Sequence, residues 1–262
     1  MKNAAIIFKK EIKEVIKNKN IWMPILIITA VFSIGMPLAI TIGSNAILKD
    51  GDTINFINKV FGYTDDPMRV LIGFTIKQFL ILLLMIPAMV PSLIAPASII
   101  MEKESNTLEP LLATPIKTSE LMLGKSLTAL VPAFVISTIN FILLAAVIDI
   151  TSYIKLGFVP LPTIEWVIVA FVLSPIISFI ITIISIIVSS KSTDIRSAQG
   201  IGSIIIIPIY AIIGFQIAGF FLMNIAYLLL GCLVLILTCP LLLKLCTKIF
   251  DRENVLTKWK MK

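Results

Sequence analysis

The sequence predicts an all-α integral membrane protein: six transmembrane helices, an N-terminal amphipathic helix at the membrane interface and a short cytoplasmic helix. Of its 262 residues, 58% are hydrophobic and only 14% are charged, whereas a soluble domain usually carries about a quarter charged residues. The mean hydropathy is +1.04. A soluble core of this size cannot absorb so much apolar surface, so the excess is expected to face lipid.

The first predicted element is an amphipathic helix within residues 1–20. Phe8, Ile12, Val15 and Ile16 recur at helical spacing, and the lysines of this segment lie mainly elsewhere around the helix. A basic helix with one apolar face lies along the inner membrane surface. A charged lead-in that is merely solvated is the alternative.

Six spanning helices are predicted within residues 21–246, because about 20 apolar residues are needed to cross a bilayer. The uncharged run Ser197–Leu243 is too long for one helix and is expected to turn near Gly219–Asn224. A re-entrant pair in its place is the alternative. Residues 247–262 form a basic tail. The four other runs, of one helix each, are Asn20–Leu48, Gln78–Met101, Ser126–Ile148 and Trp166–Ser190.

The distribution of basic residues predicts that both termini lie in the cytoplasm and that the chain resides in the cell membrane. Of the 22 Lys and Arg residues, 17 fall in the two terminal segments and in the loops 102–125 and 191–196. Only 4 fall in the predicted outer segments, 44–69 and 149–165, as the positive-inside rule requires. The same loops account for the net charge of +7, so a nucleic-acid partner is not expected.

The loop 102–125 predicts a short amphipathic helix outside the bilayer. Thr107 can cap this helix, Glu109 in its first turn complements the helix dipole, and Pro115 ends it. Such a helix fits a groove on a cytoplasmic partner. Binding to the bilayer surface is the alternative, but surface helices are usually basic and this segment is acidic. The apolar stripe consists of Leu108, Leu111 and Leu112.

This loop resembles the first cytoplasmic loop of ABC-2 type transporter permeases, although Asn106 stands where that family usually has glycine. The matching residues are Glu102-Lys103-Glu104, Thr107-Leu108-Glu109, Leu111-Leu112, Thr114-Pro115, Glu120 and Gly124-Lys125.

The resemblance implies the transmembrane permease subunit of an ATP-driven exporter, which couples ATP hydrolysis by a separate ABC ATPase to substrate export. It also implies a second permease copy, in a homodimer or a related heterodimer, and ATP and magnesium bound by the ATPase. The loop would be the coupling helix. Its ATPase-coupling residues would be Glu102, Glu104, Thr107, Leu108, Glu109, Leu111, Leu112, Pro115 and Glu120.

No catalytic, cofactor-binding or metal-binding residue is predicted in this chain. The sequence has no histidine, which removes Ser-His and Cys-His nucleophilic pairs. Gly124-Lys125-Ser126 resembles the end of a phosphate-binding loop, but position 119 is Ser119 where that motif needs glycine. Lys125 is instead expected to anchor its helix at the inner headgroups.

Polar residues of two spanning helices suggest either packing or a substrate path. Lys77 is expected to extend to the outer interface; contact with an anionic substrate is the alternative. In the fourth helix, small hydroxyl side chains recur every three or four residues and suit close helix packing, with a polar substrate path as the alternative. These residues are Ser174, Ser178, Thr182, Ser185 and Ser189.

Three prolines make the second helix the one expected to bend. Three other functions are less well supported by the sequence. A stand-alone secondary transporter needs ionisable residues at mid-membrane, and none occurs in the uncharged runs. An intramembrane enzyme lacks histidine and a carboxylate pair at that depth. A non-transporting membrane assembly factor is opposed only by the resemblance. The prolines are Pro87, Pro91 and Pro96.

Overall fold

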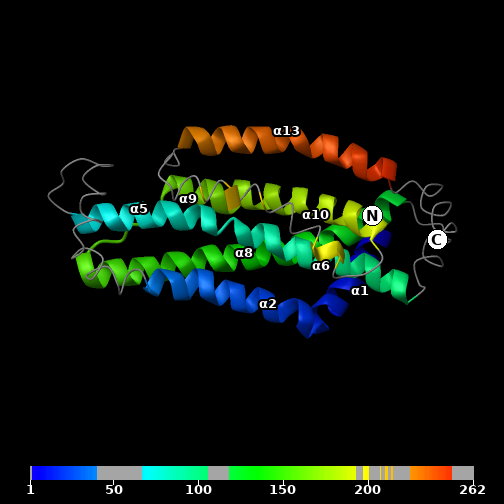
Figure 1. Cartoon of the computed structure of the whole chain (residues 1–262), viewed down its shortest axis with the longest axis horizontal. Coiled ribbons are helices and arrows are strands. Elements are labelled where there is room, and N and C mark those ends of the chain that lie inside the picture. Colours follow the sequence, from blue (N-terminus) through cyan, green and yellow to red (C-terminus); the bar gives the residue numbers. More distant parts are fainter. Residues whose placement is uncertain are drawn as a thin grey trace.

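The computed structural model describes residues 2–39, 67–105, 118–192, 197–200, 207, 210–211, 214 and 225–249. Within these ranges the chain is helical and has no strands. Its long helices lie side by side along one axis (Figure 1). Five of the described helical stretches are long and apolar enough to cross a membrane. The prediction of an all-α integral membrane protein is therefore confirmed.

The helices follow the predicted order, and several extend beyond the predicted spans. α8 alone has 39 residues and so measures roughly 58 Å, well beyond the roughly 30 Å of hydrocarbon in a bilayer. The bounds are α1 Lys2–Lys17, α2 Lys19–Ala30, the π-helix η1 Val31–Gly35, α5 Pro67–Leu82, α6 Met85–Glu104, α8 Thr118–Leu156, α9 Ile164–Ile168, the π-helix η2 Val169–Leu173, α10 Ser174–Lys191 and α13 Ile225–Ile249.

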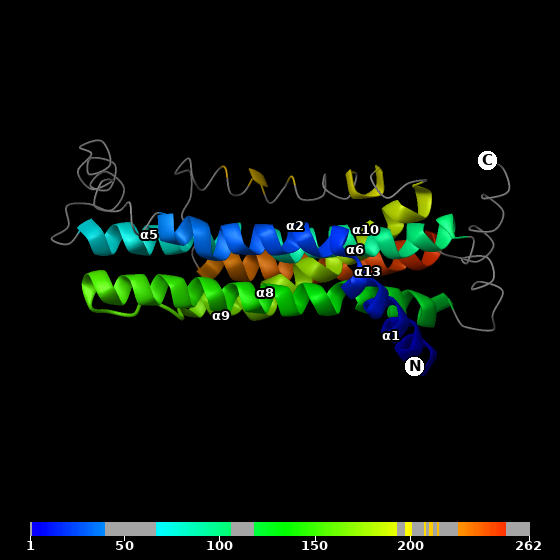
Figure 2. The ribbon, with the colours of Figure 1, turned by 90° about the horizontal axis from the view of Figure 1, so that it is seen from below.

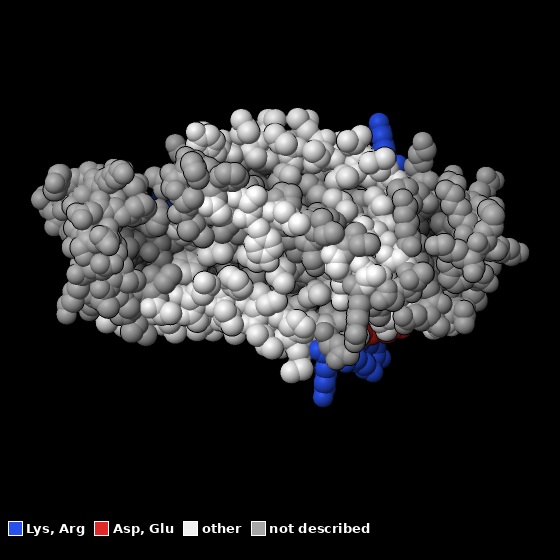
Figure 3. Space-filling view, in the orientation of Figure 1, with Lys and Arg blue, Asp and Glu red and all other residues white. Residues whose placement is uncertain are grey.

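The core lies where α6, α8 and α10 pack against one another. α6 is the most enclosed of the spanning helices, whereas little of α13 is buried. Large apolar side chains are exposed along α13 and along the outer side of α8, as expected of surfaces that face lipid. In Figure 3 most of the described surface is uncharged, and Lys and Arg side chains project mainly at the upper and lower margins right of centre.

The amphipathic helix α1 leaves the axis of the bundle. Figure 2 shows α1 at an angle to α2, and the two helices meet at Asn18. Ala4, Ile7 and Val15 are buried on its inner side, and α1 packs mainly against α8. Of the apolar face predicted from the sequence only Val15 is buried, whereas Phe8 and Ile12 are half-buried and Ile16 is exposed.

The second predicted span is broken into α5 and α6 by a turn at Leu83 and Leu84. Pro87 has no N–H to donate to the Leu83 carbonyl four residues earlier, and its ring crowds that carbonyl. The Leu83 carbonyl accepts instead from Ile86 N at 3.1 Å. The helix is therefore interrupted in the span where the bend is predicted, one turn before the first of the three prolines.

The last two predicted helices are described unequally. α10 and α13 run in the same direction in Figure 1, so their connected ends lie at opposite ends of the bundle. The predicted fifth helix falls between them and lies mostly outside the described residues, as does the turn expected at Gly219–Asn224. α13 begins at Ile225, directly after that turn.

Candidate functional site

A buried group of three charged side chains joins α1, α6 and α8. Lys125 of α8 places its Nζ 2.7 Å from Glu11 Oε1 of α1 and 2.7 Å from Glu102 Oε2 of α6. The three residues are only 2%, 4% and 9% exposed, respectively. We call this group the ion triad. Because charges this far from water are stable only when paired, the triad fixes the three helix segments relative to one another.

The ion triad corrects the role expected of Lys125. A lysine that reaches the lipid headgroups keeps its ammonium group in water, but the Lys125 side chain is almost fully buried and ion-paired. The prediction of a headgroup anchor is therefore wrong. The sequence contained no sign of this pairing, because Glu11 lies 114 positions away.

The neighbouring Gly124 lets α1 approach α8 closely. A β-carbon at Gly124 would lie 3.0 Å from the Ala4 carbonyl oxygen and 3.0 Å from the Ile7 β-carbon. Only glycine leaves room for this approach of the two backbones. Gly124 and Lys125 therefore act together. Gly124 lets α1 pack closely on the surface of α8, and Lys125 forms an ion pair with the Glu11 carboxylate of α1.

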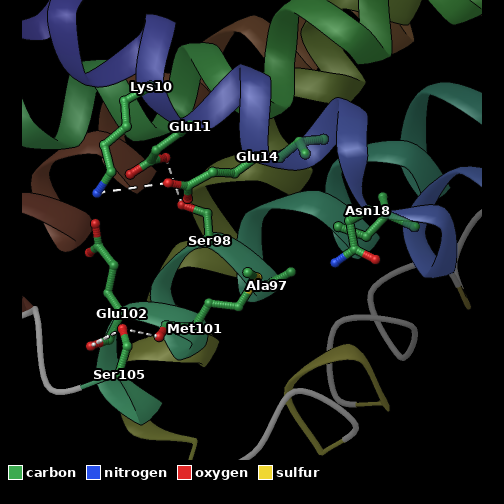
Figure 4. Close-up of a pocket in the computed structure, with 11 residues that line it drawn as sticks. Lys10, Glu11, Glu14, Asn18, Ala97, Ser98, Met101, Glu102 and Ser105 are labelled. Atoms are coloured by element: carbon green, nitrogen blue, oxygen red, sulfur yellow. Dashed lines mark hydrogen bonds and ion pairs between the residues drawn. The ribbon is translucent and has the colours of Figure 1, made fainter.

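A pocket of about 330 Å³ lies beside the ion triad, between α1 and α6. In Figure 4 the acidic side chains of α1 turn toward α6, and Glu11 meets Ser98 between the two helices. Ser98 Oγ donates to Glu11 Oε2 at 2.8 Å. The pocket is lined in part by Lys10, Glu14, Asn18, Ser98, Met101 and Glu102.

The predicted loop 102–125 is shorter in the structure than in the prediction. Glu102 and Glu104 belong to the last turn of α6, and Glu120 belongs to the first turn of α8. The segment between the helices is reduced to about residues 105–117. Its predicted contact residues lie outside the described part of the chain; they are Thr107, Leu108, Glu109, Leu111, Leu112 and Pro115.

The two helices that flank this segment are nevertheless joined by an ion pair. The pair of Glu102 and Lys125 joins the last turn of α6 to the third turn of α8.

A family model described as ABC-2 family transporter protein matches residues 5–230. The chain belongs to this family. Searches for similar curated proteins and for similar solved structures each returned no match.

Membership of the ABC-2 family makes the chain a membrane permease of an ABC-type transporter. It is the membrane component of such a transporter and not its ATPase. The matched region includes the amphipathic helix α1 from residue 5 onward and both helices that flank the loop. The ion triad therefore lies wholly within the family domain.

The hydroxyl stripe of α10 lies inside the packed bundle of this ABC-2 family permease. Ser178 Oγ donates to the Pro87 carbonyl of α6 at 3.0 Å. In a regular helix this carbonyl would accept from the N–H of residue 91, but Pro91 has none. Ser178 thus supplies the donor that Pro91 lacks. At most 1% of the surface is exposed in Ser174, Ser178, Thr182, Ser185 and Ser189.

Replacing Ser178 with alanine is expected to lower the free energy of unfolding by about 1–2 kcal/mol, because the buried Pro87 carbonyl loses its donor. Ser185→Ala is the matched control. Ser185 is equally buried on the same helix, but its Oγ has no hydrogen-bond partner among the described residues, so little change is expected. SDS-induced unfolding in detergent micelles measures both variants.

A second background tests the explanation given for Ser178. Pro91→Ala restores an N–H that can donate to the Pro87 carbonyl. The decrease in the free energy of unfolding caused by Ser178→Ala should therefore be smaller in the Pro91→Ala background. An equal cost in both backgrounds would mean that the contribution of Ser178 is unrelated to the proline.

Two further polar positions lie elsewhere in the bundle. Lys77 is half-buried in α5, which continues ten residues before it, to Pro67. A buried network that sequence reasoning missed joins η1 to α8: Ser33 Oγ donates to Asn140 Oδ1, and Asn140 Nδ2 donates to Thr29 Oγ1 at 3.2 Å. The one signal for it in the sequence was a lone amide within an apolar run.

Proposed function

We propose that this chain is the permease subunit of an ATP-driven exporter, and that a separate cytoplasmic ABC ATPase drives it through the segment between α6 and α8. The ATPase binds ATP and magnesium. A second permease copy, identical or related, completes the transmembrane pathway. Both termini and the segment between α6 and α8 then lie on the cytoplasmic side of the cell membrane.

The observation that carries this proposal is the ion pair between Glu102 and Lys125, within a chain of the ABC-2 family. A segment that receives force from a partner can move a helix bundle only if its ends are attached to that bundle. Here the end of α6 and the start of α8 are bound to each other by charges that are almost fully buried. The two helices that flank the segment are thus fixed to each other.

The second support is the character of the segment itself. Leu108, Leu111 and Leu112 form one apolar stripe in the sequence, and acidic residues precede it. This pattern fits insertion of a short helix into a groove on a soluble partner. The basic residues of the chain fall mainly in the segments expected on the same side of the membrane.

The double substitution Leu108→Asp and Leu111→Asp is expected to abolish co-purification with the ATPase, because two charges cannot enter an apolar groove without loss of solvation. The matched control replaces both residues with methionine, which keeps the apolar stripe and should retain the ATPase. Co-purification that survives both aspartates would exclude this segment as the binding site.

A further inference from the structure

The ion triad connects a third helix to the two helices, α6 and α8, that flank the proposed ATPase-binding segment. Its third member, Glu11, lies on α1, a helix that is remote in sequence from both. Lys125 is the common partner, so α1 is bound to the paired segments of α6 and α8 that carry Glu102 and Lys125, which we call the α6–α8 platform. Any displacement of this platform acts on α1 directly.

Two further contacts of α1, and one between α8 and α6 beside them, strengthen this attachment. Ser98 Oγ of α6 donates to Glu11 Oε2 at 2.8 Å, and Lys125 Nζ donates to the Ser98 carbonyl at 3.4 Å. The absence of a side chain at Gly124 brings the α8 backbone against Ala4 and Ile7. α1 is therefore fixed by charge at Glu11 and by close packing about one to two turns earlier.

The junction of α1 with α2 is also tied. The Asn18 carbonyl accepts from Ile21 N at 3.1 Å, and Asn18 N donates to the Val15 carbonyl at 3.1 Å. Trp22 Nε1 of α2 donates to the same Val15 carbonyl at 3.0 Å. A side chain that crosses the junction in this way limits bending there. Movement of α1 should consequently reach α2 instead of being absorbed at Asn18.

We infer that α1 is a second route of transmission, in which the ion triad carries the displacement of the α6–α8 platform through α1 into the first spanning helix, α2. This inference rests on the proposed function, in which the ATPase moves that platform. Glu11 and Lys125 are positioning residues in this route. A stationary α1, held only by the membrane surface, is the competing arrangement.

The charges of the ion triad permit a clean test. Two carboxylates face one ammonium group, so Glu11→Gln removes the charged link to α1 and leaves Glu102 and Lys125 as a balanced pair. That variant is expected to fold. The matched control is Glu14→Gln, which removes a carboxylate from the same helix; its side chain is 52% exposed and pairs only with Lys10 within the described part of the chain.

The experiment measures distances by pulsed electron spin resonance in the complete complex with the ATPase, in lipid nanodiscs. Cys232, Cys239 and Cys246 are first replaced with alanine, and the labelled chain is mixed with excess unlabelled chain. One label is placed at Tyr153, at the far end of α8. The second is placed at Lys13 on α1 or at Ser105 at the end of α6; all three labelled positions are exposed. Nucleotide-free and ATP–vanadate states are compared.

In the otherwise unaltered chain, both distances are expected to change on trapping with ATP and vanadate. In Glu11→Gln, the change at Ser105 should remain and the change at Lys13 should be lost, while Glu14→Gln keeps both. A change at Ser105 with none at Lys13 in the unaltered chain overturns the inference and leaves the proposed function standing. Equal changes at Lys13 with and without Glu11 also overturn the inference. No change at Ser105 removes the proposed function and the inference with it.

Discussion

Replacing Lys125 with methionine is expected to lower the free energy of unfolding by about 3–5 kcal/mol, the cost of leaving a buried charge without its partner. Lys125 is 2% exposed and lies between two carboxylates that are almost as deeply buried. Methionine fills similar space but removes the only cation of the ion triad. SDS-induced unfolding in detergent micelles would measure the loss.

Two companion variants separate charge from packing at this site. Lys10→Met removes a lysine whose side chain is 62% exposed, and a change of about 0.5 kcal/mol or less is expected. Adding Glu11→Gln and Glu102→Gln to Lys125→Met removes all three charges and should restore much of the lost stability. If Lys125→Met alone behaves like Lys10→Met, the ion triad does not hold these helices together.

Replacing Gly124 with alanine is expected to separate α1 from α8 and to lower the free energy of unfolding by about 1–3 kcal/mol. The new β-carbon would lie 3.0 Å from the Ala4 carbonyl oxygen and from the Ile7 side chain. A backbone oxygen cannot rotate away as a flexible side chain can, so α1 itself has to shift. Faster tryptic cleavage at the lysines of α1, together with SDS-induced unfolding, would report this shift.

Gly231→Ala in α13 is the matched control for Gly124→Ala. No atom of the described residues lies within 4 Å of a β-carbon added at Gly231, so alanine should stabilise that helix by about 0.5–1 kcal/mol through its better helix propensity. Opposite signs at the two positions would identify contact with α1 as the cause. Stabilisation by alanine at both positions would mean that a β-carbon at position 124 does not clash with α1.

The sequence indicated the bend in the second span but not how the bundle accommodates it. Pro87 and Pro91 each remove a backbone donor, which is a local property and can be read directly from the chain. Whether the Pro87 carbonyl finds another donor depends on a helix 91 positions away, and only the packing places Ser178 beside it. The sequence therefore left both packing and a substrate path open for Ser178.

The sequence by itself determined that the chain crosses a membrane as helices, because apolar length and backbone hydrogen bonding are properties of each segment alone. It also located the segment between α6 and α8 through a short motif. It assigned Lys125 wrongly, since a lysine near the end of an apolar run is usually solvated. Only the tertiary structure decided that Lys125 is buried between Glu11 and Glu102, because the stability of a buried charge depends on partners that folding brings from distant parts of the chain.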